Sequence, residues 1–264
     1  MSSRTVIGIP GDISCRPFRD ALRSAGRFEI VLDAPASLAQ RLEHRGLNGA
    51  LLSPIDFARN ASEYLIVPGS AVSSQSGNES IVIHFRREVK TVRTLAVQPV
   101  SASDIILAKI LLAERFDVEP RILPVGGSLE EMLSRADAAL LAGDAALATA
   151  MERPEAIDLV EEWIAATDLP YVHGFWCARE NMLSEGERSL LGGLGNTADD
   201  PAAGAGEPSP LDLFSYDFPD NVQEGIREFL RYAYYHGILP DVPDLRFFGS
   251  GDADENEPPM PGVN

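Results

Sequence analysis

Short apolar runs alternate with longer amphipathic stretches along most of the chain. The short runs are typical of buried strands, and the amphipathic stretches have the spacing of helices that bury one face. Strands that alternate with helices indicate parallel α/β units joined by right-handed connections. The expected strands cover residues 6–9, 28–32, 49–52, 64–67, 80–85, 94–97, 121–124, 138–141 and 171–178, and the expected helices cover 17–24, 36–45, 103–116, 129–134, 145–151, 158–166 and 221–236, with a short helix after Pro54.

The alternation breaks once, and the break predicts two lobes. No helix separates the expected strands at 64–67 and 80–85, and the strand–helix pattern then restarts at Thr94. The predicted fold is therefore α/β, with two lobes and a ligand cleft between them. We expect lobe 1 to contain residues 1–93 together with 211–248, and lobe 2 to contain residues 94–183.

The composition changes sharply after the last expected strand. Residues 184–210 are rich in Gly, Pro, Ser and acidic residues, which is typical of a flexible insertion. Residues 249–264 combine acidic residues with Gly and Pro, so we expect a disordered acidic tail. The glycines at 192, 193 and 195 fall inside the insertion and not in a strand-to-helix turn, so they do not indicate a nucleotide-binding loop.

The charge balance excludes several classes of partner. The chain has 264 residues, of which 40 are acidic and 22 are basic, so its net charge is −18. Nucleic acids and anionic membrane surfaces attract clustered Lys and Arg, and neither partner is expected here. The apolar run near the N-terminus is too short for a signal peptide or a membrane span. The sequence therefore predicts a cytoplasmic protein that binds a small molecule, and it does not predict the oligomeric state.

Metal and cofactor chemistry is not expected from the residue types present. The two Cys residues form no CxxC pair, and the four His residues are scattered along the chain. The sequence contains neither a Rossmann glycine motif nor a P-loop motif. We therefore expect no metal, no organic cofactor and no bound nucleotide.

Serines concentrate at three expected turns. Ser73 and Ser74 stand in one polar segment, Ser101 and Ser103 lie at the start of a long helix, and Ser14 precedes the first helix. Hydroxyls and free backbone N–H groups at helix starts bind anions. The same serines also serve as ordinary helix caps and turn residues, and both interpretations remain open.

A few further side chains are candidates for chemistry. Gly143 and Asp144 precede an expected helix, where Asp144 either caps the helix or faces the cleft as an acid or orienting group. His84 and His173 lie in strand patterns, which favours packing in the core. Cys15 lies in a strand-to-helix turn with no His nearby in sequence, which favours a passive thiol.

Five segments occur in a characteristic order: LNGALLSPIDFARNASEYLIVPGSAVSS, SIVIHF, KTVRTLAVQPVSASDIILAKILLAERFDVEPRILP, ADAALLAGDAAL and LPYVHGFWCARE. Over roughly residues 5–180 the chain thereby resembles the chorismate dehydratases of the futalosine route to menaquinone. The resemblance implies a two-lobed fold like that of the type II periplasmic solute-binding proteins. It also implies a lyase that removes water from chorismate to give 3-(1-carboxyvinyloxy)benzoate, with no metal or organic cofactor.

The resemblance also implies site residues. Ser73, Ser74 and Ser80 match serines of the family, and Gly143 and Asp144 match its Gly-Asp pair. Together with the turns described above, the predicted catalytic residues are Ser14 and Asp144, and the predicted substrate-binding residues are Ser73, Ser74, Ser80, Ser101, Ser103 and Gly143. No metal ligands are predicted.

The chain departs from the family pattern at three ligand-facing turns. Ser14 stands where the family has Asn, Ala102 stands where it has Arg, and residues 75–78 replace its Asp-Gly-Pro. These departures keep a second function class open, a two-lobed protein that binds a small aromatic or carboxylate ligand without converting it. A sister enzyme of the pathway, acting on a cyclised futalosine product, is a third option that the paired serines and the Gly-Asp pair disfavour.

No good general base stands in the matched motifs. Dehydration of chorismate nevertheless requires removal of a ring proton. We therefore hypothesise that the side-chain carboxylate of the substrate takes this proton itself.

Overall fold

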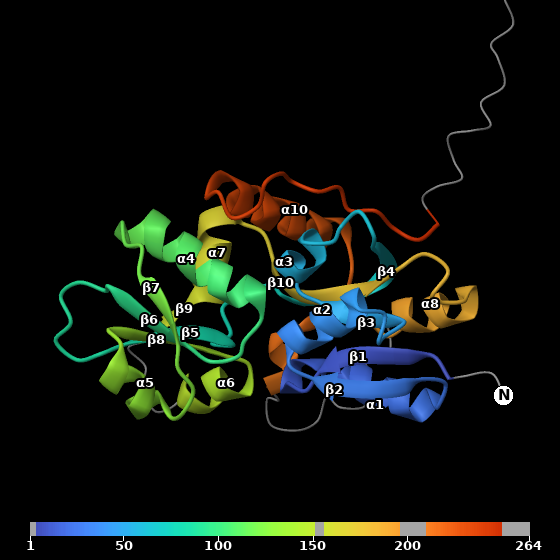
Figure 1. Ribbon diagram of the computed structural model, residues 1–264, viewed down its shortest axis with the longest axis horizontal. Coiled ribbons are helices and arrows are strands. Elements are labelled where there is room, and N and C mark those ends of the chain that lie inside the picture. The colour runs from blue at the N-terminus through green and yellow to red at the C-terminus, as the bar shows by residue number, and fades with distance from the viewer. Residues whose placement is uncertain (1–3, 151–155, 196–209, 250–264) are drawn as a thin grey trace, which may run out of the picture.

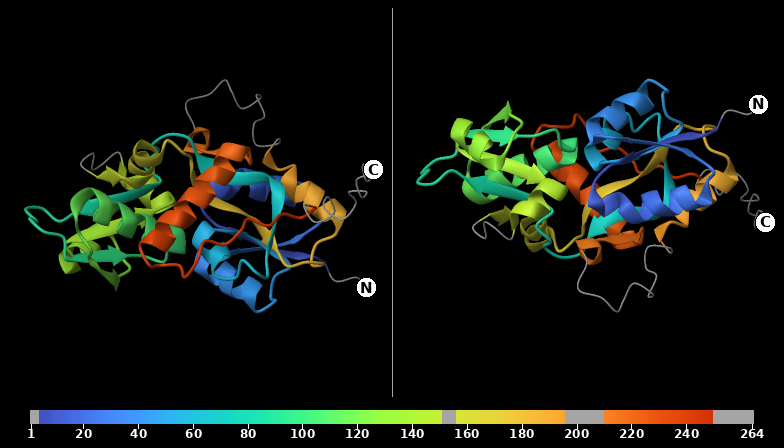
Figure 2. Two further views of the ribbon diagram at one scale, coloured as in Figure 1. Left: turned by 90° about the horizontal axis from the view of Figure 1, so that it is seen from above. Right: turned by 90° about the horizontal axis from the view of Figure 1, so that it is seen from below.

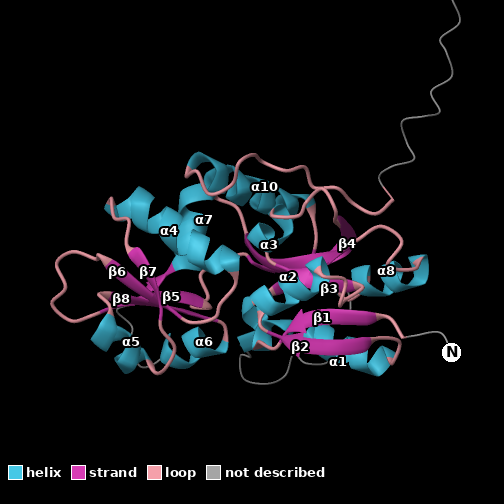
Figure 3. Cartoon of the chain, in the orientation of Figure 1, coloured by secondary structure: helices cyan, strands magenta, loops and turns pink. Residues whose placement is uncertain are grey.

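The computed structural model describes residues 4–150, 156–195 and 210–249 as two α/β lobes side by side (Figure 1). Each lobe is a β-sheet with helices on both faces, as Figure 3 shows. Helix α10 (Asp220–Tyr235) lies across the junction of the lobes, which is plain when the molecule is seen from above (Figure 2). The expected α/β fold with two lobes is confirmed.

The sheet of lobe 1 combines a parallel part with an antiparallel part. Its strand order is β11 (Ser215–Asp217), β4 (Leu65–Ser74), β10 (Tyr171–Ala178), β3 (Gly49–Leu52), β1 (Val6–Pro10) and β2 (Glu29–Asp33). Strand β1 is parallel to both of its neighbours, β2 and β3, whereas β10 is antiparallel to β3 and β4. The carboxyl ends of the three parallel strands therefore lie at one edge of the sheet.

The sheet of lobe 2 has the same mixed character. Its strand order is β7 (Arg121–Pro124), β6 (Thr94–Val97), β8 (Ala138–Ala142), β5 (Ile81–Phe85) and β9 (Ile157–Asp158). Strand β6 is parallel to β7 and β8, and β5 is antiparallel to β8 and β9. The short strands β9 and β11 are absent from the sequence-based expectation, because so few residues show no readable periodicity.

Two strands lie in the lobe opposite to the one expected. Strand β5 pairs with β8 along its whole length and belongs to lobe 2, whereas β10 lies between β3 and β4 and belongs to lobe 1. The expected lobe boundaries after residues 93 and 183 are therefore wrong, since the chain enters lobe 2 between β4 and β5 and leaves it between α7 (Leu159–Thr167) and β10. An apolar pattern reveals that a strand is buried, but it does not reveal its partner.

Apolar helix faces cover both sides of each sheet. In lobe 1, α1 (Arg16–Ala25) and α8 (Glu185–Gly192) cover one face, and α2 (Pro35–Glu43), α3 (Pro54–Ala58) and α10 cover the other. In lobe 2, α4 (Ala102–Phe116) and α7 cover one face, and α5 (Leu129–Arg135) and α6 (Asp144–Ala150) cover the other. The largest apolar cluster includes residues of both lobes, so one continuous core holds them together.

Aromatic side chains of α10 contribute to this shared core. Phe229 packs edge-on against Trp163 of α7, with ring centroids 5.6 Å apart, and against Tyr171 of β10, at 5.8 Å. Full burial of one large apolar side chain stabilises a fold by roughly 1.5–3 kcal/mol. Helix α10 therefore helps to fix the lobes around the space between them.

Part of the expected flexible insertion is a packed helix. Glu187 accepts hydrogen bonds from the backbone N–H and the hydroxyl of Ser184, which closes a capping box at the start of α8. Gly192 lies so close to β4 that an added Cβ would stand 2.3 Å from the carbonyl oxygen of Pro68. The expectation is therefore wrong for residues 185–192, because the glycine that suggested a loop permits close packing. Residues 196–209 and the expected tail after residue 249 lie outside the described residues.

The predicted polar turn at Ser73 and Ser74 is also wrong. Both serines lie in β4, which is hydrogen-bonded to β10 on one side and to β11 on the other. The hydroxyl-rich composition resembles a turn, but the two neighbouring strands satisfy the backbone there.

Candidate active site

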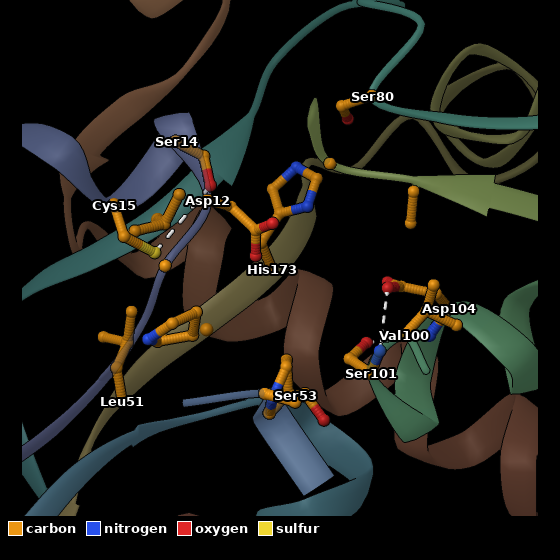
Figure 4. A pocket seen from close by; sticks show the side chains of 18 of the residues that line it. Asp12, Ser14, Cys15, Leu51, Ser53, Ser80, Val100, Ser101, Asp104 and His173 are labelled. Atoms are coloured by element: carbon orange, nitrogen blue, oxygen red, sulfur yellow. Dashed lines mark hydrogen bonds between the residues drawn. The ribbon is translucent and has the colours of Figure 1, made fainter. Parts of the chain in front are cut away.

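A cavity of about 380 Å³ lies between the two lobes. Residues that follow the carboxyl ends of β1, β2 and β3 line it from lobe 1, and residues that follow β6 and β8 line it from lobe 2. Ligands of α/β proteins bind at this end of parallel strands, where the following turns expose N–H groups and side chains. Figure 4 shows the lining side chains converging from both lobes. The expected cleft between the lobes is confirmed.

The turn after β1 presents two polar side chains to the cavity. Asp12 precedes the 3-10 turn η1 (Ile13–Cys15), and its side chain makes no capping hydrogen bond. Among the described residues, the hydroxyl of Ser14 hydrogen-bonds only the Cys15 sulfur, at 3.8 Å. Both Asp12 and Ser14 line the cavity, so the predicted site residue Ser14 is in place and the sequence analysis missed Asp12.

Asp12 stands where the two lobes meet. Burial raises the pKa of the Asp12 carboxyl above its usual range, and the nearby Asp144 carboxylate raises it further. Asp144 itself accepts a hydrogen bond from the backbone N–H of Ile13, at 2.8 Å, and so ties the start of α6 to η1. Gly143 lines the cavity with φ +60°, and a Cβ there would stand 2.6 Å from Asp12 Oδ1.

The predicted Gly-Asp pair therefore forms an interlobe contact. Gly143 is required for the close approach of Asp12, and Asp144 is occupied by the Ile13 N–H and is absent from the cavity lining. The geometry assigns Asp144 to positioning the turn that carries Asp12 and Ser14.

The turn after β6 is closed by its own hydrogen bonds. Ser101 Oγ accepts from the N–H of Asp104 at 3.1 Å, and the Asp104 carboxylate accepts from the N–H of Ser101 at 3.2 Å. Tyr171 donates to the same carboxylate at 3.2 Å. Ser101 and Asp104 line the cavity, but these N–H groups are already bonded within the protein. The capping box therefore uses two of the backbone N–H groups that this helix start was expected to offer to an anion.

Ser103 is also a structural residue. It is fully buried, and its hydroxyl accepts a hydrogen bond from the N–H of Ile55 at 3.0 Å, which joins the starts of α3 and α4. It does not line the cavity. The structure therefore places Ser103 away from the cavity lining, where its hydroxyl accepts from a backbone donor of the neighbouring helix.

The three serines around β4 and β5 have different surroundings. Ser73 is fully buried, its hydroxyl has no hydrogen-bond partner in the described part of the chain, and it does not line the cavity. Ser74 lies just behind the lining and hydrogen-bonds His173 Nε2 at 2.8 Å. Ser80 lines the cavity. The structure thus places Ser80 at the site and Ser74 next to it, and it does not bring Ser73 to the cavity lining.

Two more residues line the cavity, His173 and Asp104, and the sequence analysis predicted neither of them as a site residue. His173 was expected to pack in the core; its ring does pack between Tyr171 and Phe214, but it also lines the cavity. Burial lowers the pKa of His173 to about 3, so the ring is neutral. Burial raises the pKa of Asp104 to about 6, in spite of its hydrogen bonds to Ser101 and Tyr171. The sequence held a signal for Asp104 alone, because its spacing from Ser101 matches a capping box.

The charge of the cavity is negative. Asp12, Asp33 and Asp104 line it, and none of the described lining residues is Lys or Arg. Burial raises the pKa of the Cys15 thiol to about 12, which supports the passive-thiol interpretation. Among the described residues, no cluster of three or more His, Cys, Asp or Glu side chains could hold a metal ion. Hydroxyls, backbone N–H groups and the neutral imidazole are therefore the donors available to a ligand.

Comparison with known proteins finds relatives that match most of the chain. A family model described as menaquinone biosynthesis matches residues 5–193. The chain is 27% identical to chorismate dehydratase of Thermus thermophilus over 266 residues, which cover 90% of this chain and 97% of that protein. Within the part of the chain that the structure describes, no helix is both long and apolar enough to cross a membrane.

Solved structures share the two-lobed architecture. Protein AF1704 of Archaeoglobus fulgidus superposes with a TM-score of 0.68 at 17% identity, covering 90% of this chain and all of that one (100%). The alkanesulfonate-binding protein SsuA of Xanthomonas axonopodis pv. citri superposes with a TM-score of 0.60 at 15% identity, covering 90% and 95% of the two chains. The fold is that of the periplasmic binding proteins. Because the family model spans most of the chain and contains all five resembling segments, the chain belongs to the menaquinone biosynthesis family, as its resemblance to the chorismate dehydratases implied.

Proposed function

We propose that this protein dehydrates chorismate to 3-(1-carboxyvinyloxy)benzoate in menaquinone biosynthesis. The observation that carries the proposal is the cavity between the lobes, which joins hydroxyl and imidazole donors with buried carboxylates. Its volume of about 380 Å³ suits a ligand with one six-membered ring. The similarity to a chorismate dehydratase along 90% of the chain supports the same substrate.

The reaction makes modest demands on the protein. A proton leaves C3 of the ring, hydroxide leaves C4, and the two together form water while the ring becomes aromatic. The protein must hold the ring in one orientation, place a base beside C3 and donate a hydrogen bond to the departing hydroxyl. The residues that line the cavity supply donors from both lobes, which supports a protein role in orienting the ring and assisting the departing hydroxyl.

Two carboxylates can take the C3 proton. One is Asp12, which lines the cavity and whose raised pKa makes it a stronger base than an exposed carboxylate. The other is the side-chain carboxylate of the substrate. If Asp12 is the base, Asp12→Asn lowers kcat by at least about 100-fold. If the substrate is the base, Asp12→Asn retains turnover, and an analogue that lacks the side-chain carboxylate binds but is not dehydrated.

The decisive experiment is incubation of the purified protein with chorismate. We expect a new aromatic absorbance and a product mass that is lower by one water. Asp244→Asn is the matched control for Asp12→Asn, because Asp244 is exposed and does not line this cavity. Chorismate that binds without conversion would contradict the proposal and favour a non-catalytic binding protein. Chorismate that neither binds nor reacts would favour the sister enzyme of the pathway.

A further inference from the structure

A chain of hydrogen bonds behind the cavity wall orients His173. Asn78 Oδ1 accepts from the backbone N–H of Ser80, at 3.1 Å, and from the Ser80 hydroxyl, at 2.7 Å. Asn78 Nδ2 donates to the carbonyl oxygen of Leu213, at 3.2 Å, and to Ser74 Oγ, at 2.7 Å. A backbone N–H can only donate and a carbonyl can only accept, so these contacts determine which end of the Asn78 amide is which.

The orientation of Asn78 determines where the Ser74 proton goes. Ser74 Oγ receives a hydrogen bond from Asn78, and its other partner is His173 Nε2, at 2.8 Å. Ser74 is fully buried, and a buried hydroxyl seldom leaves its proton unpaired. Ser74 therefore donates to Nε2. Since Nε2 accepts, the proton of the neutral ring resides on Nδ1.

The ring is held so that Nδ1 remains available. Tyr171 contacts the ring edge-on, with centroids 5.0 Å apart and planes at 87°, and Phe214 does so at 5.3 Å and 72°. Nδ1 has no hydrogen-bond partner among the described residues, and His173 lines the cavity, as Figure 4 shows.

Two of the four serine hydroxyls that line the cavity are already committed as donors. Ser53 donates to the Asp56 carboxylate at 2.8 Å, and Ser80 donates to Asn78. No Lys or Arg is found among the described residues of the lining. A carboxylate ligand therefore has few side-chain donors to choose from, and the Nδ1–H of His173 is one of them.

We propose that His173 is a neutral hydrogen-bond donor that binds a substrate carboxylate through Nδ1–H, with Ser74 and Asn78 as positioning residues that set its tautomer. The tautomer assignment does not depend on the proposed function, whereas the identity of the carboxylate ligand rests on the proposed function. His173 does not act as a base in this arrangement, because its one basic nitrogen is occupied by Ser74.

Two substitutions test the roles of the two ring nitrogens of His173 separately. In His173→Asn, the amide nitrogen can occupy the place of Nδ1 but cannot reach Ser74. In His173→Gln, the amide reaches Ser74 but leaves no donor at Nδ1. We expect His173→Asn to bind chorismate within about threefold of the parent, and His173→Gln to bind about 10- to 100-fold more weakly. His236→Gln is the control and leaves binding unchanged, because His236 hydrogen-bonds Glu114 and does not line the cavity.

The tautomer is read directly from nitrogen spectra of protein labelled with ¹⁵N-histidine. In the free protein we expect a pyrrole-type signal for Nδ1 and a pyridine-type signal for Nε2 of His173, unchanged between about pH 5 and 8. Ser74→Ala should mix the two tautomers. An Nε2–H tautomer in the parent, or equal chorismate binding by the Asn and Gln variants, would overturn the inference. If the parent fails to bind or convert chorismate, the proposed function fails, and the spectrum of the free protein still decides the tautomer.

Discussion

Two strand-to-helix turns face each other across the cavity, one from each lobe. The turn after β6 is closed by a capping box, a tyrosine and a contact with the neighbouring helix start, so its polar groups bond mainly to one another. In the turn after β1, neither N-cap residue caps its own helix, Asp12 for η1 or Cys15 for α1, and Asp12 and Ser14 face the cavity.

The local sequence explains this difference. Ser101 and Asp104 have the spacing of a capping box, which satisfies two backbone donors with two side chains. The helix after β1 carries Pro17 in its first turn, which has no N–H, so one donor that would need a cap is missing. A serine at a helix start is therefore available to a ligand only when the helix does not use it. The following predictions test that comparison.

The largest expected effect concerns Asp104, the buried carboxyl of the closed turn. Its pKa rises from 3.8 in the unfolded chain to about 6 in the folded protein. The folded state therefore binds more protons between these values, and its stability falls as the pH rises from about 4 to 7, by about 3 kcal/mol for this group. Asp104→Asn removes this dependence. Denaturant unfolding of both proteins at several pH values measures it, and parallel curves would contradict the assigned burial.

The next effect concerns Ser103, which connects the starts of α3 and α4. In Ser103→Ala the N–H of Ile55 loses its buried acceptor, and we expect the free energy of unfolding to fall by about 1–3 kcal/mol. Turnover of chorismate per folded molecule should not change, because Ser103 does not line the cavity. Reduced binding with unchanged stability would instead return Ser103 to the ligand site.

Ser14 in the open turn should behave in the opposite way. Within the part of the chain that the structure describes, its hydroxyl bonds only to the Cys15 sulfur, so Ser14→Ala should change the free energy of unfolding by no more than about 0.5 kcal/mol. Chorismate binding should weaken by about 3- to 10-fold, as expected for the loss of one hydroxyl hydrogen bond. Denaturant unfolding measures the first quantity and titration calorimetry measures the second, for Ser14→Ala beside Ser103→Ala. A stability loss in the Ser14 variant would show that the two turns are equivalent.

The smallest effect is expected at Ser73. Its buried hydroxyl has no hydrogen-bond partner among the described residues, so Ser73→Ala removes an unsatisfied polar group at little cost. We expect unchanged chorismate binding and a free energy of unfolding that stays equal or rises by up to about 1 kcal/mol. Weaker binding in this variant would support the original assignment of Ser73 to the substrate site.

Some of the residues that line the cavity could be predicted from the sequence, and others could not. It found Ser14, Ser80, Ser101 and Gly143 because serines and a Gly-Asp pair at strand ends are visible as patterns. It missed Asp12, Asp104 and His173, and it assigned Ser73 and Ser103 to the ligand. Whether a hydroxyl faces a ligand or a backbone N–H of another helix depends on contacts such as that between Ser103 and Ile55, which lie far apart in the sequence.

The sequence by itself determined the properties that depend on neighbouring residues. Apolar periodicity determined most strands and helices, the spacing of Ser101 and Asp104 determined a helix cap, and residue counts determined the negative charge. Only the tertiary structure decided that β5 belongs to lobe 2 and β10 to lobe 1, that residues 185–192 pack as a helix, and that Asp12 lies against Gly143. The reason is physical: periodicity records whether a side chain is buried, whereas strand partners, pKa values and access to a cavity depend on which distant residues bury it.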